Sequence, residues 1–68
     1  MIQMGKLIKK AREDRGYTQE ELAVMSGYGS RSIRRWESGR GEPSLLKAQV
    51  CLESMGCSLE NVILMEAA

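Results

Sequence analysis

The sequence predicts a compact all-α fold in which five short helices form one domain over residues 1–68. Apolar side chains recur at three- and four-residue intervals, which is the spacing of one helix face. A glycine or a proline lies where most of these periodic segments start or stop. The longest apolar run, residues 62–65, has four residues, so no membrane span is expected.

The first helix is expected over residues 4–15. Its apolar residues follow the i, i+3, i+4, i+7 rule and would face the core together. Gly16 follows the last turn and suits the left-handed conformation that often ends a helix. The predicted buried stripe contains Met4, Leu7, Ile8 and Ala11.

The second helix has two start signals around its first turn. Thr18 and Glu21 have the spacing of a capping box, in which each side chain bonds the other residue's backbone N–H. Tyr17 and Leu22 are placed to form a hydrophobic staple across the same turn. Gly27 suits the left-handed turn that should end this helix near residue 25 or 26.

The third helix, expected to begin near residue 29 or 30 and to end before Gly39, has two chemically different faces. Because successive residues rotate by about 100°, its basic side chains gather within an arc of about 100°. Ile33 and Trp36 point the other way, with Glu37 beside them. The basic face contains Arg31, Arg34, Arg35 and Ser38.

Two more helices follow a tight loop at residues 39–42. Pro43 and Ser44 suit the start of the fourth helix, and Gly56 suits its end. Ser58 should cap a short fifth helix, and residues 65–68 are expected to fray. The side chains expected to face the core are Leu45, Ala48, Leu52 and Met55 in the fourth helix and Leu59, Val62 and Ile63 in the fifth.

The composition leaves little material for catalysis. The chain has no histidine, and Cys51 and Cys57 belong to no C-x-x-C pair or cluster of other ligands. A zinc site or a Cys-His nucleophile is therefore not expected, and reduced, half-buried thiols are favoured over a disulfide. We predict no catalytic residue, no metal, no cofactor and no small-molecule ligand, which argues against an enzyme.

The charge is distributed unevenly along the chain. Residues 1–47 contain all ten basic side chains and six acidic ones, a net charge of +4, whereas residues 48–68 contain three glutamates and no base. The first part of the chain is therefore suited to an anionic partner. Charge alone remains compatible with ordinary solvated helix faces.

The basic face of the third helix has two interpretations. On an isolated helix it would be a solvated surface. Its arginines, however, have few acidic neighbours at i±4 to pair with, and clustered guanidinium groups repel one another unless they meet an anion. Guanidinium groups match both guanine and phosphate. At the start of the second helix, Gln19 lies beside free backbone N–H groups, where a phosphate can bind.

The order of these motifs resembles the helix-turn-helix domain of the phage repressor and Cro family, also called the XRE family. The resemblance covers about residues 4–64. It implies a lambda-repressor-like fold in which the second and third helices form the helix-turn-helix. It rests on Arg15 with Gly16, residues 18–23 (TQEELA), Gly27, residues 30–37 with Gly39, Pro43 with Ser44 and Leu45, and Ser58 with Leu59.

The resemblance implies roles in binding double-stranded DNA for individual residues. The third helix, about residues 30–37, would enter the major groove. Ser30, Arg31 and Arg35 match positions whose side chains reach base edges, and Arg34 matches a position that sometimes does. Positions near the DNA backbone are matched by Thr18, Gln19, Ser32, Ser38 and Arg40.

Other matched positions concern structure. Arg12 matches a basic residue that in some members pairs with the acid matched by Glu37, which would link the first helix to the third. Gly29 stands where the family usually has a serine or threonine N-cap, so Ser30 is an alternative cap that would shift the helix by one residue. Trp36 matches an apolar core position, so core packing is expected for it rather than base stacking.

Members of this family usually dimerise on an inverted repeat, which places two recognition helices in successive major grooves about 34 Å apart. We therefore expect a homodimer, with intrachain packing of the fifth helix as the alternative. The expected function is sequence-specific repression of transcription in the cytoplasm, from a bacterial or phage gene. The competing class is a protein-interaction module, such as an antitoxin that also represses its own promoter. The dimer candidates are Leu59, Val62, Ile63 and Met65.

Overall fold

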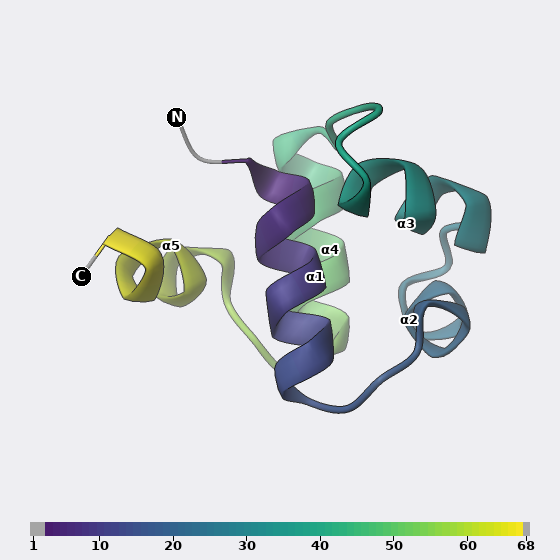
Figure 1. Ribbon diagram of the computed structural model, residues 1–68. Helices are drawn as coiled ribbons and strands as arrows, with labels where there is room; N and C mark the ends of the chain where they lie inside the picture. Colours follow the sequence, from purple (N-terminus) through teal and green to yellow (C-terminus); the bar gives the residue numbers. More distant parts are fainter. Residues whose placement is uncertain (1–2, 68) are drawn as a thin grey trace.

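The computed structural model describes residues 3–67, with side chains described up to residue 64. The described residues form five helices and no strand. Figure 1 shows α1 and α4 side by side in the centre, α2 and α3 together on one side, and α5 on the other. The predicted all-α fold is confirmed. The elements are α1 (Met4–Asp14), α2 (Gln19–Ser26), α3 (Ser30–Glu37), α4 (Leu45–Ser54) and α5 (Leu59–Ala67).

Side-chain caps fix the starts of three helices. The Thr18 hydroxyl accepts a hydrogen bond from the Glu21 N–H at 3.0 Å, and the Glu21 carboxylate accepts one from the Thr18 N–H at 2.8 Å. The capping box predicted for α2 is therefore present. Ser44 and Ser58 cap α4 and α5 in the ordinary way, through hydroxyls that accept from backbone N–H groups at 3.2 and 3.1 Å.

The start of α3, unlike the starts of α2, α4 and α5, has no side-chain cap. Gly29 is its N-cap residue, with extended backbone angles and no side-chain cap bond, and Ser30 is the first helical residue. The alternative in which Ser30 caps the helix is therefore wrong, and the helix is not shifted by one residue. At the end of α2, Gly27 has a φ of 84°, the left-handed conformation expected for the turn.

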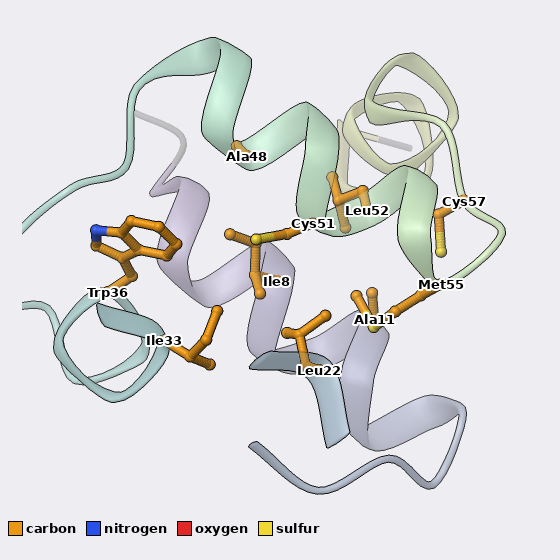
Figure 2. Close-up of a cluster of buried hydrophobic side chains, with 10 residues drawn as sticks. All are labelled: Ile8, Ala11, Leu22, Ile33, Trp36, Ala48, Cys51, Leu52, Met55 and Cys57. Carbon is orange, nitrogen blue, oxygen red and sulfur yellow. The ribbon is translucent and has the colours of Figure 1, made fainter. Parts of the chain in front are cut away.

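One apolar cluster joins the first four helices and the segment before α5 (Figure 2). Ile8, Leu22 and Ile33 are completely buried in it, and Trp36 belongs to it as expected. Burying such side chains is the main driving force for folding. The cluster contains Ile8, Ala11, Leu22, Ile33, Trp36, Ala48, Cys51, Leu52, Met55 and Cys57.

The inner face of α4 corrects one prediction. Leu45 is 61% exposed and does not face the core, whereas Cys51 is completely buried. Successive residues of a helix rotate by about 100°, so Leu45 and Cys51 lie on opposite edges of the face that contains Ala48 and Leu52. The core covers the edge with Cys51 and leaves the edge with Leu45 in solvent. Cys51 and Cys57 are both free thiols and more deeply buried than the half-buried state expected. Burial raises the pKa of Cys51, which favours the protonated thiol.

Gly5 allows α1 and α3 to approach closely. A methyl group at this position would lie 1.9 Å from the Trp36 carbonyl oxygen, far inside van der Waals contact. Only glycine fits at this position without a shift of the α1 or α3 backbone. The sequence pattern gave no indication of this contact.

Over residues 59–64, the last helix has no fully buried side chain. Val62 and Ile63 are half-buried, whereas Leu64 is 60% exposed. The helix continues to Ala67, so the fraying expected from residue 65 is not seen as far as that residue, and residue 68 lies outside the described residues. Between α4 and α5 lies an open groove of about 450 Å³, lined in part by Gln49, Leu59 and Ile63. Within residues 3–67, no helix is both long and apolar enough to cross a bilayer.

Candidate nucleic-acid interface

The helices α2 and α3 and the turn at Gly27 form a helix-turn-helix in which α3 presents one face to solvent. Ile33, Trp36 and Glu37 are the buried residues of α3. The ring of Tyr28, in the turn, meets the Trp36 ring edge-on, with centroids 5.5 Å apart. This aromatic contact favours one orientation of α3 against the turn.

The exposed face of α3 is strongly basic. Arg31, Arg34 and Arg35 are all exposed, and together with Ser38 and Arg40 they line one open hollow of about 630 Å³. We call this surface the arginine hollow. It brings together all three predicted arginines of α3 and the arginine of the following loop, so it can receive an anionic group from several sides.

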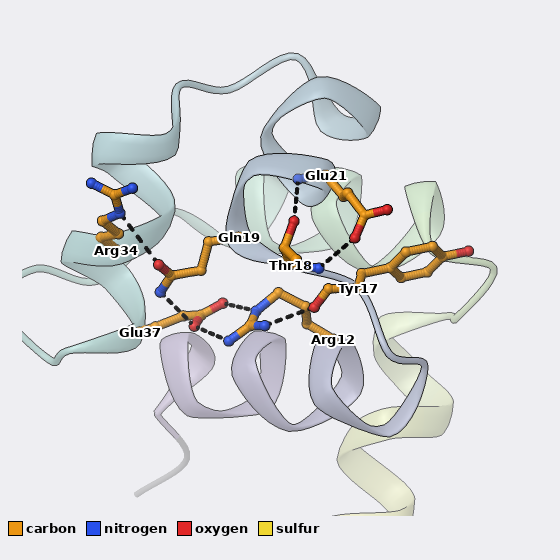
Figure 3. Close-up of polar contacts among 7 residues, drawn as sticks. All are labelled: Arg12, Tyr17, Thr18, Gln19, Glu21, Arg34 and Glu37. Atoms are coloured by element: carbon orange, nitrogen blue, oxygen red, sulfur yellow. Dashed lines mark hydrogen bonds and ion pairs between the residues drawn. The ribbon is translucent and has the colours of Figure 1, made fainter.

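A polar network anchors the inner side of α3 to α1 (Figure 3). The guanidinium of Arg12 donates from Nε to Glu37 Oε2 and from Nη2 to Glu37 Oε1, both at 2.9 Å, a bidentate pair. Its Nη1 donates to the Tyr17 carbonyl at 2.8 Å. The Arg12 and Glu37 side chains are only 12% and 3% exposed. The hydrogen bonds with Glu37 raise the pKa of Arg12, so this guanidinium stays charged.

Gln19 extends this network to the solvent-exposed face. Its Nε2 donates to Glu37 Oε1 at 3.1 Å, and its Oε1 accepts from Arg34 Nε at 3.3 Å. These two bonds fix which end of the amide faces which partner. Gln19 lies at the start of α2 as expected for a phosphate contact, but its amide also joins the buried pair to the arginine hollow.

Arg34 has an acidic partner that the sequence analysis missed. Its Nη2 pairs with Glu20 Oε2, and both side chains are 60% exposed. The hydrogen bond from Arg34 lowers the pKa of Glu20. The expectation of unpaired arginines is therefore wrong for Arg34, because its partner comes from α2, fourteen residues away, rather than from one turn along α3.

The other arginines of the hollow remain unpaired within the described part of the chain. No described carboxylate forms an ion pair with Arg31, Arg35 or Arg40. Arg35 crosses the loop at Gly41, where an added methyl would lie 2.8 Å from Arg35 Nε. Gly41 thus leaves room for this side chain, a role that spacing in the sequence does not signal.

The remaining predicted contact residues lie at the edges of this surface. The Thr18 hydroxyl is engaged in the α2 cap, and the Ser38 hydroxyl donates to the Arg35 carbonyl at 3.0 Å. Ser30 and Ser32 are half-buried on α3. Among the described residues, no group of three or more histidine, cysteine, aspartate or glutamate side chains could hold a metal ion.

Comparison with known proteins identifies the family. The chain is 34% identical over 64 residues, 93% of each chain, to an uncharacterized HTH-type transcriptional regulator of Methanothermobacter thermautotrophicus. It is 32% identical over 57 residues, 84% of this chain and 75% of the relative, to y4mF of Sinorhizobium fredii, also named an uncharacterized HTH-type transcriptional regulator.

A solved structure agrees with these relatives. The crystal structure of the clp gene regulator ClgR from C. glutamicum superposes with a TM-score of 0.82 at 28% identity, over 94% of this chain and 82% of that one. Residues 8–62 match the family described as Helix-turn-helix. The chain therefore belongs to the helix-turn-helix family of the phage repressor and Cro (XRE) type.

Proposed function

We propose that this protein is a transcriptional repressor that binds double-stranded DNA sequence-specifically and inserts α3 into the major groove. The observation that carries the proposal is the arginine hollow on the exposed face of the second helix of a helix-turn-helix. The major groove admits an α-helix, and guanidinium groups bind guanine O6 and N7 bidentately. The names of the relatives, HTH-type transcriptional regulators, support the same function.

Two sets of contacts follow from this orientation. Ser30, Arg31, Arg34 and Arg35 would reach base edges, and Thr18, Gln19, Ser32, Ser38 and Arg40 would lie near phosphates. Phosphate contacts position the protein, whereas base contacts specify the sequence. Because arginine–phosphate contacts release counterions, binding should weaken steeply as salt rises.

We also propose a homodimer through α5. One α3 reads only a few base pairs, and a two-fold dimer would present two such helices to an inverted repeat, about 34 Å apart. The apolar residues Val62 and Ile63 are half-buried in the monomer, and the groove beside Ile63 is open. Leu59 and Val62 both pack against the core within the same chain, whereas Ile63 is not among the residues packed there. The side chain of Met65, the remaining candidate, lies outside the described residues.

A charge on α5 tests the dimer. Val62→Glu should abolish dimers in sedimentation, because a carboxylate would be buried without a partner at the interface. The control is Val24→Glu, the same substitution at an 84% exposed site on α2, on the opposite side of the molecule from α5, and it should leave a dimer intact. An unchanged sedimentation profile for Val62→Glu would contradict the α5 interface.

The DNA-binding proposal is tested by selection from random duplexes at about 150 mM salt, the range in which specific and non-specific binding separate. Sequencing the retained pool should show an inverted repeat with half-sites about one helical turn apart. Enrichment of a single half-site would support a monomeric reader and contradict the dimer. No enrichment would contradict sequence-specific binding and favour a protein partner for the basic face.

A further inference from the structure

We propose that Glu20 is a specificity-determining residue of this interface. By neutralising Arg34, it converts this arginine from a general phosphate binder into a reader that acts through hydrogen bonds. The inference rests on the proposed DNA-binding function and deepens it. It assigns different tasks to arginines that the sequence presents as equivalent.

Arg34 is held at two points by the first turn of α2. Its Nε donates to Gln19 Oε1 at 3.3 Å, and its Nη2 pairs with Glu20 Oε2. A guanidinium has five N–H donors, so three remain, two on Nη1 and one on Nη2. A partner on DNA therefore meets an arginine that is already oriented and still has donors on both terminal nitrogens.

The hydrogen bonds behind Gln19 restrict the Arg34 side chain more than an ordinary surface contact would. The Gln19 amide is itself held by Glu37, which is anchored by the buried guanidinium of Arg12. The position of the Arg34 side chain is therefore tied to the core of the domain through a continuous chain of hydrogen bonds (Figure 3). Orienting a side chain before binding reduces the entropy lost on binding.

Charge separates Arg34 from the other members of the arginine hollow. Glu20 is in the first turn of α2, where the helix dipole favours a carboxylate, and its lowered pKa keeps it ionised at neutral pH. A phosphate that approaches Arg34 must compete with this carboxylate and is repelled by it. Arg31, Arg35 and Arg40 have no such competitor among the described side chains.

The consequence concerns specificity because phosphates occur at every step of any DNA sequence, whereas a given base edge does not. In a non-specific complex Arg34 can contact only phosphate, and Glu20 reduces that attraction. At the correct site Arg34 contacts a base edge instead, through donors that Glu20 leaves free. Glu20 therefore weakens non-specific binding more than binding to the correct site. Since both side chains are 60% exposed, the effect is expected to be modest.

A double-mutant cycle tests this assignment. Dissociation constants are measured for the selected operator and for a random duplex, across a salt series, with the wild type, Glu20→Gln, Arg34→Ala and the double variant. Glu20→Gln should strengthen binding to random DNA by roughly three- to fivefold and raise the magnitude of its salt slope by about one. Operator binding should change less, so the ratio of the two affinities should fall.

The Arg34→Ala background separates the mechanism from simple loss of a negative charge. If Glu20 acts by neutralising Arg34, Glu20→Gln should leave the affinity ratio unchanged once Arg34 is absent. Glu13→Gln, which removes the same charge from an exposed site on α1, is the matched control and should alter neither the ratio nor the salt slope appreciably. Melting temperatures of all variants establish that each one is folded.

The outcomes distinguish this inference from the function on which it depends. Equal strengthening for operator and random DNA, or a Glu20→Gln effect that persists without Arg34, would overturn the role of Glu20 while DNA binding stands. A loss of operator affinity in Glu20→Gln would overturn it too, since Glu20 would then be required for binding. A wild type with no preferred sequence would overturn the proposed function itself, and the inference with it.

Discussion

The inner and outer faces of α3, a helix of eight residues, carry charges of opposite sign in opposite environments. On the inner face, Glu37 is 7% exposed and receives three hydrogen bonds from Arg12 and Gln19. On the outer face, Arg31 and Arg35 are exposed and pair with no described carboxylate. The buried charge is satisfied inside the protein, whereas the exposed charges are left for a partner.

This difference indicates that the inner face of α3 contributes to stability and the outer face to function. A buried charge without a partner is costly, so the inner face must be completed by the protein itself. Exposed arginines contribute little to folding, so they can remain unpaired without cost to the core. Changes to the inner face should therefore reduce stability, and changes to the outer face should reduce DNA recognition.

The largest loss of stability is expected from Gly5→Ala, which places a methyl group against the backbone of α3 on its inner face. The added methyl would lie 1.9 Å from the Trp36 carbonyl oxygen, so α1 and α3 must move apart. Overpacking usually costs about 1–3 kcal/mol, and a clash with backbone should exceed that range. In a domain whose total stability is on the order of 5 kcal/mol, we expect loss of the cooperative thermal transition.

The control for Gly5→Ala is the same substitution where there is space. Gly29→Ala adds its methyl with nothing within 4 Å, and it should cost no more than about 1 kcal/mol at a helix N-cap. Both variants are compared by thermal and urea unfolding. A Gly5→Ala protein with wild-type stability would show that α1 and α3 do not require this close approach.

The next largest effect is expected from Glu37→Ala, which leaves Arg12 buried without its bidentate partner. Removing one member of a buried ion pair costs about 3–5 kcal/mol. The Arg12 side chain is only 12% exposed, so solvent would replace the carboxylate poorly. Urea unfolding should show most of the stability lost, and Glu37→Gln, which keeps one acceptor oxygen, should lose less. A melting temperature within a few degrees of the wild type would contradict this role.

The sequence predicted the course of the chain well because local signals determine it. The capping box of Thr18 and Glu21, the hydroxyl caps and the left-handed glycines act over a few residues, so their spacing is readable. The two faces of α3 follow from periodicity in the same way. The link from Arg12 to Glu37 required the family resemblance, since 25 residues separate the two.

The features that the sequence did not reveal depend on which helices meet. Glu20 pairs with Arg34 only because the turn brings the first turn of α2 against α3. Gly5 resembles any glycine in a helix until Trp36 is packed over it. The exposure of Leu45 depends on which margin of α4 the core covers. Each of these facts belongs to tertiary packing, which local spacing does not encode.

On the outer face, Arg35→Ala should separate recognition from folding. We expect it to lower operator affinity by about 1–3 kcal/mol and to relax the preference at one or two base pairs. Stability should change by no more than about 0.5 kcal/mol, because the side chain is exposed. Binding is measured against operator variants, with Arg40→Ala as the comparison, which should weaken all sequences alike. If Arg35→Ala lowers operator and random-DNA affinity equally, Arg35 is a phosphate contact.

The smallest effect is expected at Gly29, where the two faces of α3 begin. α3 has no side-chain cap, unlike α2 and α4, and the backbone of Gly29 already has the extended angles of an N-cap residue. Gly29→Ser adds a hydroxyl that can accept from a free N–H of the first turn, and no atom lies within 4 Å of the added Cβ. We expect a gain of a few tenths of a kcal/mol over glycine, read as a small rise in melting temperature. Because Gly29→Ala adds a side chain without an acceptor, it should lower stability instead, and equal shifts for the two variants would show that the hydroxyl does not cap α3.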